Sequence, residues 1–451
     1  MKNFTSKALL KKLGGLAFCL SFSATVFAQE VLTLEQSLEL ARQNNVSLRQ
    51  ARYSSDKADI NLRKSKFSYL PTLSAQTDVR RVNGLTFDNV SGELKRGNTN
   101  TSSPYMVGQL VLFDGFSKFY ELKRAQQQAE ASKFNQVQAE IDMEALITGF
   151  YLQAVLDREN IQIARERIGL IQQQVDKMEK LERAGVRTQD EVYQLKSQLA
   201  TEKLNLITQE NNYRQSLMAL VQEMNVEGST TYELQVPQTP IDINSKLPAL
   251  DVVMERAQAY SPQLKAAEAT LRASRYSHSI ARSNVSPTIA LRGIIGSNYS
   301  SNYRLADPET GTFSRVPYFD QVDQNQQKIV ELSLSIPVFG GLSRHFDAQA
   351  ARMDLRNAEL DLNAAQNSLA QTIQQAYQDV LAAQEKYNTV MANLEYTEKA
   401  FVSAKRSYDA GIIDFYAYLE SLNNKNKAQT ELLQSKCEFY FKQRILELYQ
   451  G

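Results

Sequence analysis

The chain contains two copies of one pattern, and this duplication constrains its fold more than any other feature. Two motifs recur at a constant shift of 216 residues: Leu34-Glu35 as Leu250-Asp251, and Leu70-Pro71-Thr72-Leu73 as Ser286-Pro287-Thr288-Ile289. Farther along the shift is 226, with Phe113-Asp114-Gly115 matched by Phe339-Gly340-Gly341 and Gly185 by Gly411. The difference places about ten extra residues between the two predicted strands of the second copy, where a loop absorbs them.

An Ala-Gly pair ends a long apolar repeat in each copy. The pairs are Ala184-Gly185 and Ala410-Gly411. Glycine adopts positive φ without a steric cost, which a reversal between two helices usually requires. Each copy therefore reads as a helix, two strands, a long helix, a reversal and a returning helix.

Strand-like alternation of apolar and polar residues occurs twice in each copy. The segments are approximately 72–80, 105–113, 288–296 and 330–338, and residues 83–103, rich in Gly, Asn, Thr and Ser, read as a loop. Strands of about ten residues with one apolar face are typical of tilted membrane β-barrels. Four strands cannot close a barrel alone, so this interpretation requires oligomerisation. The alternative is the edge of a soluble β-sandwich.

Two segments of about 68 residues, 117–184 and 343–410, read as uninterrupted helices on the order of 100 Å long. The far half of each carries an apolar heptad, beginning at Ile161 and at Tyr387. The helix before each strand pair, 34–70 in the first copy, and the returning helix are each about half as long. Placed end to end, they would match the long helix, forming a wall that needs neighbouring subunits to bury its second face.

The amino terminus predicts export. Four lysines precede the apolar run Leu16 to Phe27, and small residues before Ala28 favour cleavage after it, so residues 1–28 are expected to be a signal peptide. A short transmembrane anchor is the alternative, although the run is shorter than the ~20 residues of a span. Cys437 is then the only cysteine, which excludes an intrachain disulfide. The expected domains are a first repeat at 29–226, an equatorial linker at 227–248 and a second repeat at 249–451.

Histidines and the sequence motifs typical of catalytic, nucleotide-binding or metal sites are scarce in this chain. The net charge is +1, which disfavours nucleic acid as a partner, and only His278 and His345 occur. No metalloprotease, phosphate-loop or nucleophile-elbow motif is found, and Gly340-Gly341 is better interpreted as a tight turn. The sequence predicts no enzyme, no cofactor and no metal site.

In order and spacing, these motifs resemble those of the TolC-like outer membrane efflux proteins, or outer membrane factors. The resemblance rests on Leu32 to Ala41, on Leu70 to Leu73, on Leu112 to Gly115 and its counterpart Val338 to Gly341, and on both Ala-Gly reversals. It implies an α+β membrane protein in the outer membrane of a Gram-negative bacterium. Three chains would share a twelve-stranded β-barrel, with four strands each, continued by a coiled-coil periplasmic tunnel.

The function implied by the resemblance is that of a passive exit duct for small molecules. Its partners would be two further copies of the chain, a periplasmic adaptor, a proton-driven or ATP-driven inner-membrane pump and outer-membrane lipid. A type I protein secretion duct is an alternative that the sequence does not separate from efflux. A periplasmic coiled-coil scaffold without a pore is a third, which the strand alternation disfavours.

The resemblance also implies where the tunnel closes. By position, Tyr408 corresponds to the family's gate tyrosine, Glu191 to its acidic partner and Glu420 to an acid of the lumen. Gly185, Val186, Gly411 and Ile412 would contact the adaptor. The family's gate arginine, two residues after the second glycine, is Ile413 here, and an expected acid is Ala417, which predicts a weaker gate. A carboxylate ring would favour cations.

Overall fold

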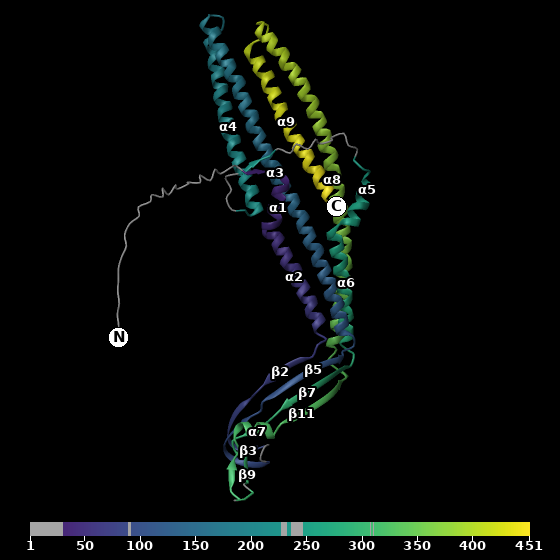
Figure 1. The fold of residues 1–451 in the computed structure, drawn as a ribbon. Helices are drawn as coiled ribbons and strands as arrows, with labels where there is room; N and C mark the ends of the chain where they lie inside the picture. Colours follow the sequence, from purple (N-terminus) through teal and green to yellow (C-terminus); the bar gives the residue numbers. More distant parts are fainter. Residues whose placement is uncertain (1–29, 89–91, 227–231, 236–246, 307, 310) are drawn as a thin grey trace, which may run out of the picture.

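The structure, a computed structural model, describes residues 30–88, 92–226, 232–235, 247–306, 308–309 and 311–451. The predicted signal peptide and most of the predicted linker lie outside the described residues. The molecule is elongated, with a curved sheet at one end and two helical hairpins at the other (Figure 1). Among the described residues, no helix is both long enough and apolar enough to cross a membrane.

The two halves have the same order of major elements. In the first half these are α1 (Leu34–Asn44), α2 (Val46–Phe67), β2 (Thr72–Gln76), β5 (Tyr105–Phe113), α3 (Ser117–Arg183) and α4 (Gln189–Met224). In the second half they are α5 (Leu250–Tyr260), α6 (Pro262–Ser283), β7 (Thr288–Gly296), β11 (Gln327–Ser335), α8 (Ser343–Asp409) and α9 (Phe415–Leu448). Both long helices have 67 residues, as their lengths in the sequence predict.

The prediction of one unbroken helix over 34–70 is wrong. The Thr33–Gln36 capping box begins α1 as expected, but the helix ends at Asn44. The side chain of Asn45 then accepts a hydrogen bond from the Leu48 amide and caps α2. Ser261 does the same for α6 through the Leu264 amide, and Pro262 occupies the first turn. Asn and Ser favour such caps because their side chains satisfy the free amides of a new helix.

The main sheet is antiparallel in the order β11-β7-β5-β2. Its register places Leu73, Met106, Leu291 and Leu332 on one face. The opposite face is mixed: it holds the Arg292–Glu331 ion pair, Gln109 and Ser333, together with Val107, Ile294 and Ile329. The last strand begins and ends three residues earlier than predicted, at Gln327 and Ser335, since the chain leaves the sheet ahead of Pro337, which cannot donate to a ladder.

The prediction that residues 83–103 form a loop is also wrong. They lie mostly in a hairpin, with β3 (Val79–Asp88) antiparallel to β4 (Glu93–Ser102). The hairpin pairs with β8 (Tyr299–Ser300) of the other half, beside β9 (Arg304–Ala306), β10 (Phe313–Arg315) and α7 (Tyr318–Gln324). Gln321 of α7 is fully buried and bonds the backbone of Ser300 and Val316. Cross-strand hydrogen bonds therefore outweigh the turn-like composition.

A small parallel pair at mid-height joins the predicted linker to the start of the first repeat. β1 (Glu30–Leu32) pairs with β6 (Tyr232–Leu234). The buried hydroxyl of Tyr151 lies within hydrogen-bond distance of the carbonyls of Leu32 and Gln235, and burial raises its pKa. The linker is therefore anchored to α3 at this point, rather than irregular throughout.

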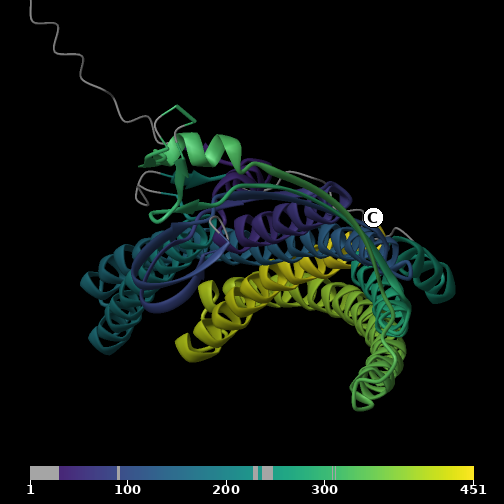
Figure 2. The same ribbon diagram turned by 90° about the horizontal axis from the view of Figure 1, so that it is seen from below.

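The helices form a curved wall (Figure 2). On the sheet side of mid-height, the neighbours across the wall run α2, α3, α6, α8, and on the other side they run α4, α3, α9, α8. The predicted heptad of α3 from Ile161 to Met178 packs inward as expected. One lateral edge of the sheet-side half is α2 and the other is α8.

Candidate functional site

The two reversals form neighbouring tips at the end of the molecule farthest from the sheet (Figure 1). Gly185 and Gly411 have φ of 71° and 73°, in the left-handed region that favours glycine. Amides just past each helix bond carbonyls of its last turn, Val186 to Leu181 at 2.9 Å and Ile412 to Ser407 at 2.8 Å. Val186 and Ile412 are 65% and 76% exposed, so both tips present an apolar side chain to solvent.

The helices that return from the tips begin differently. In the first tip, Thr188 and Glu191 form a capping box, in which the side chain of each accepts from the backbone amide of the other. In the second tip, the Asp414 side chain accepts a hydrogen bond from the Ala417 amide at 2.9 Å. The methyl side chain of Ala417 cannot accept a hydrogen bond from the Asp414 amide in return. The two tips are therefore unequal in how their returning helices are capped.

A buried apolar cluster, the tip cluster, joins the two hairpins. Its members are Ile171, Val175, Met178, Val192, Leu195, Leu199, Tyr408, Phe415, Tyr418 and Leu422. The Tyr408 ring is 5% exposed and stacks on Tyr418 at 5.0 Å between centroids. Its hydroxyl points to the sulfur of Met178, at 3.9 Å. Burial raises the pKa of Tyr408, with Glu191 also raising it and Arg187 lowering it.

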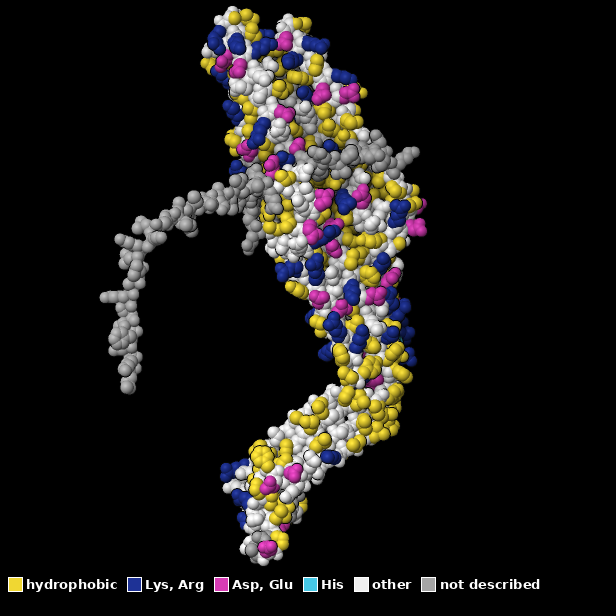
Figure 3. Space-filling model, viewed as in Figure 1, with side chains coloured by type: hydrophobic (Ala, Val, Ile, Leu, Met, Phe, Trp, Pro, Cys, Tyr) yellow, Lys and Arg dark blue, Asp and Glu magenta, His cyan; other side chains and the backbone are white. Residues whose placement is uncertain are grey.

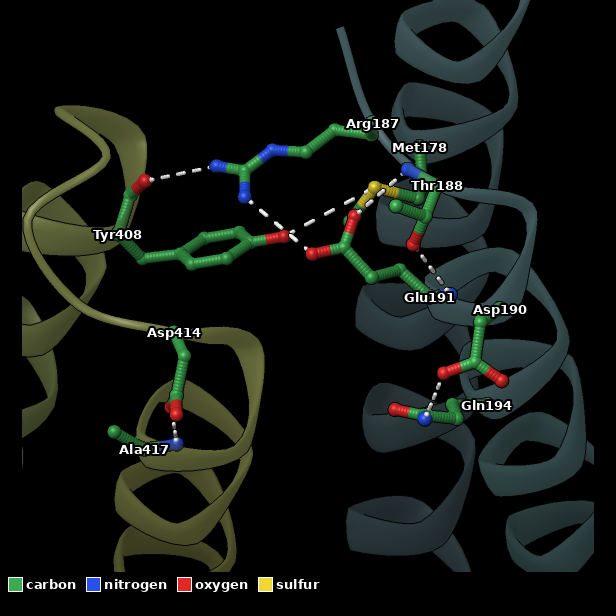
Figure 4. Close-up of polar contacts among 9 residues, drawn as sticks. All are labelled: Met178, Arg187, Thr188, Asp190, Glu191, Gln194, Tyr408, Asp414 and Ala417. Atoms are coloured by element: carbon green, nitrogen blue, oxygen red, sulfur yellow. Dashed lines mark hydrogen bonds and ion pairs between the residues drawn. The ribbon is translucent and has the colours of Figure 1, made fainter.

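Arg187 connects the predicted gate residues (Figure 4). Its guanidinium lies 4.7 Å from the centre of the Tyr408 ring and donates to the Tyr408 carbonyl at 3.3 Å. The same group pairs with Glu191 at 3.4 Å, and both side chains are about one-fifth exposed. A planar guanidinium can stack and donate at once, which a lysine ammonium cannot. Arg187 therefore holds the first tip on the second.

Two further contacts join the hairpins on their exposed sides. Lys177 of α3 pairs with Asp409 of α8 at 2.7 Å. Gln194 of α4 donates to the hydroxyl of Tyr416 of α9, also at 2.7 Å. Exposed pairs contribute little individually, so the buried cluster and Arg187 dominate the connection.

The structure brings together only part of the predicted set. Tyr408 and Glu191 lie on either side of Arg187, whereas Glu420 is exposed on α9, and no hydrogen bond or ion pair joins it to either of them within the described residues. Ile413 packs against the tip cluster. Sequence reasoning looked for the arginine at Ile413 and missed Arg187, although it stands two residues after Gly185, as Ile413 does after Gly411.

These groups suit a mechanical contact more than a reaction. In the part of the chain that the structure describes, no three His, Cys, Asp or Glu side chains are placed to hold a metal ion. Aromatic rings, a guanidinium and one carboxylate instead form a clasp between two hairpins. Its strength depends on how well the rings remain desolvated.

Burial in the tip cluster shifts the titration of Tyr418. Burial raises its pKa to about 12. The neutral phenol is thus favoured in the folded state, so its contribution to stability persists up to about pH 10, the ordinary value, and is lost as the pH rises through 12. The absorbance difference at 295 nm between the protein and Tyr418→Phe is expected to show a midpoint near 12. A midpoint near 10 would mean that the ring is hydrated.

Comparisons with known proteins agree with this architecture. The model of the family described as "Outer membrane efflux protein" matches residues 37–226 and 253–443. The chain is 24% identical to Protein CyaE of Bordetella pertussis over 385 residues, covering 84% of this chain and 76% of the relative. It is 22% identical to Outer membrane protein TolC of Escherichia coli over 435 residues, covering 95% and 83%.

The fold is also that of a solved outer membrane protein, VceC from Vibrio cholerae. The TM-score is 0.76 at 15% identity, covering 93% of this chain and 96% of the other. The family match spans both halves of the chain, and its two segments correspond to the two sets of matching elements. The chain therefore belongs to the outer membrane efflux protein family and lies in the outer membrane of a Gram-negative bacterium, with its helical tunnel in the periplasm.

Proposed function

We propose that three copies of the chain close into an exit duct that passively conducts small molecules across the outer membrane. An adaptor would dock at the tips and an inner-membrane pump would supply the energy. The observation that carries the proposal is that one chain has two unpaired lateral edges, each with a strand and a helix. In this proposal, residues 1–28 are a signal peptide that is removed on export. Residues 29–226 and 249–451 of the mature chain are tandem repeats.

The strand edges support a shared barrel. β2 and β11 lie at opposite edges of the sheet, and every residue of both is exposed in the single chain. Val330 is 81% exposed and Leu332 67%. A long, apolar, open edge invites pairing with another strand. Because neighbouring strands alternate in direction, β11 of one copy would meet β2 of the next as an antiparallel pair. Three copies of four strands would give twelve.

The helix edges carry matching apolar stripes. On α2 the stripe steps by seven residues through Val46, Tyr53, Ile60 and Phe67, all at least half exposed. On α8 it steps by seven through Phe346, Met353 and Leu360, which are 45–64% exposed. A seven-residue apolar spacing is the signature of a helix seam that packs on another helix. Each α2 would pack on α8 of the neighbouring copy. Because the two surfaces differ, the contact repeats head to tail, and a rotation of one third of a turn per copy would close it into a ring of three.

A duct of this kind needs a polar interior and a closed entrance. The face with Arg292, Glu331 and Ser333 would line the pore, and the face with Leu291, Leu332 and Leu334 would meet lipid. The tips, held by Arg187 and the tip cluster, would be the closed end. The gate residues we propose are Tyr408, Glu191 and Arg187. Glu420 would be a carboxylate of the lumen rather than part of the clasp.

Replacing Gly411 by valine is expected to abolish export while the trimer remains. No atom lies within 4 Å of a side-chain carbon built there, so the cost is backbone strain, about 1–2 kcal/mol or more for a branched residue. That strain would distort the tip that docks on the adaptor. In cells that lack the wild-type protein, an effluxed dye should accumulate to the level of the empty strain.

Gly169→Val is the matched control, because Gly169 lies within α3 with no positive φ and no close neighbour. It should export normally. Dye export by Gly411→Val at the wild-type rate would contradict docking at the tips. If dye export never depends on the protein, but secretion of a protein substrate does, the duct serves type I secretion instead.

A further inference from the structure

We propose that the helix ends nearest the sheet form a collar that binds anionic phospholipid headgroups of the membrane leaflet facing the periplasm. The inference rests on the proposed insertion of the strands into the membrane. It goes beyond that function because it assigns a lipid chemistry to a surface that neither the pore nor the tips require. Charge, lack of ion pairing and exposed aromatic rings each support it.

The charge is concentrated in the three helical turns beside the sheet. Four windows of eleven residues, 57–67 of α2, 117–127 of α3, 273–283 of α6 and 343–353 of α8, contain eleven Lys or Arg and three carboxylates. The cations are Lys57, Arg63, Lys64, Lys66, Lys118, Lys123, Arg124, Arg275, Arg282, Arg344 and Arg352. The net charge of these windows is +8 in a chain whose total is +1. Figure 3 shows Lys and Arg gathered around these helix ends and few charges over the sheet.

In the part of the chain that the structure describes, these cations have no carboxylate partner within salt-bridge distance. Within the described residues, none of the eleven forms an ion pair with a carboxylate, and none is buried. Farther from the sheet, basic residues cross between helices to acids, as Lys133 does to Asp59 at 3.3 Å and Arg272 to Glu130 at 3.3 Å. Some basic residues farther from the sheet are therefore neutralised by acids of the wall, whereas, among the residues described, none of the eleven beside the sheet is. Unpaired cations at one level indicate an external anionic surface.

Exposed aromatic rings lie at the same level. Outside the two helix stripes, Tyr69, Phe116, Phe119 and Phe339 are 44–82% exposed. Lys118 lies 5.9 Å from the centre of the Tyr69 ring and Lys123 lies 5.8 Å from that of Phe119. Tyr69 is amphipathic and favours the boundary between acyl chains and headgroups, and the phenylalanine rings present apolar surface at the same level. A cation beside such a ring lies where a lipid phosphate would be.

The electrostatic principle sets the size of the effect. A basic residue near an anionic membrane surface contributes about 1 kcal/mol, or roughly a fivefold change in affinity. A neutral or zwitterionic headgroup has no net charge to attract. The collar should therefore enrich anionic lipid around the protein, and salt should weaken that enrichment.

The test reconstitutes the trimer in bilayers of phosphatidylethanolamine with three parts in ten phosphatidylglycerol. Spin-labelled analogues of the two lipids report the relative association of each with the protein boundary. We expect phosphatidylglycerol to be preferred on the order of fivefold. The preference should fall towards one in 0.5 M NaCl, and in the variant with Lys64, Lys66, Lys118 and Lys123 replaced by Gln.

A second variant controls for net charge. Lys180, Lys203, Lys405 and Lys436 are exposed, form no ion pair among the described residues and lie far along the helices from the sheet. Their replacement by Gln removes the same charge and should leave the preference unchanged. Equal association of both lipids with the wild type, or an equal loss in both variants, would overturn the collar.

Inorganic phosphate at 10 mM separates a lipid site from a site for any anion. The proposal expects no competition, and displacement of phosphatidylglycerol by phosphate would contradict it. Failure of the protein to enter the bilayer at all would instead overturn the proposed function. Insertion without lipid preference would overturn the collar alone.

Discussion

Replacing Ile60 by Glu is expected to abolish the trimer. Ile60 is 61% exposed in the single chain and lies at the centre of the apolar stripe of α2. In the proposed ring it is buried against α8 of the next copy, where an isoleucine contributes about 1.5–3 kcal/mol. A carboxylate buried there without a partner costs several kcal/mol more. Since the change occurs at three interfaces, mass measurement of the purified protein should find monomers and a loss of dye export.

The neighbouring Asn61 offers a matched control. It is also exposed on α2 but lies outside the stripe. Asn61→Glu adds the same charge and should remain trimeric, as should the conservative Ile60→Leu. A trimeric Ile60→Glu protein would show that α2 is not an interface.

Replacing Arg187 by alanine is expected to open the tips without dissolving the trimer. The change removes a stacked guanidinium, worth about 0.5–1 kcal/mol, and a charged hydrogen bond, worth about 1.5–3 kcal/mol. Glu191 also loses its cation. A loss of about 2 kcal/mol in each of three copies matches the ~5.5 kcal/mol that converts a mostly closed population into a mostly open one. Single-channel conductance of the reconstituted protein should rise severalfold.

Two substitutions at the same tip distinguish the loss of the Arg187 contacts from the loss of one positive charge. Among the described residues, the ion pairing of Arg183 stays within its own helix, with Glu179 at 3.7 Å, so Arg183→Ala should leave the conductance low. Arg187→Lys keeps the charge but loses the planar fork, so it should conduct at an intermediate level. Conductance of Arg187→Ala equal to that of the wild type would remove Arg187 from the gate.

Much of the fold could be predicted from the sequence because its elements are long and periodic. Sixty-seven-residue helices and nine-residue alternating strands repeat a signal many times, and the predicted bounds of β5 and β7 agree with the structure. The errors occur where a single side chain sets a helix boundary, or where a strand forms because it pairs with a segment far away in the sequence. Asn45 breaks a helix by capping the next one. The β3–β4 hairpin pairs with β8, some 200 residues away.

The site was less predictable. The two glycines mark both tips, and the family resemblance selects Tyr408, which the structure buries between the two hairpins. The position of Arg187 across the Tyr408 ring depends on how two hairpins pack, which no local pattern encodes. The family pattern places its gate arginine at the position that Ile413 occupies in this chain. Here the guanidinium comes instead from Arg187 of the other tip. The exposed position of Glu420, on the surface of α9 away from the clasp, likewise depends on packing.

The closure of three copies through β2 and β11 is the central claim, and cysteine cross-linking tests it most directly. Ser74 of β2 and Ile329, Glu331, Ser333 and Ser335 of β11 lie on the same face of the sheet. Directly paired strands hold Cα atoms about 4.5–5.5 Å apart, within the range of a disulfide. In a Cys437→Ser background, Ser74→Cys combined with one of the four β11 positions should cross-link.

The closed ring predicts a ladder of monomer, dimer and trimer on a denaturing gel, ending at the trimer, for one or two adjacent β11 positions. The remaining positions should stay monomeric, because only one register brings the sulfurs together. A ladder that continues past three copies, or no cross-link at any of the four positions, would contradict the duct.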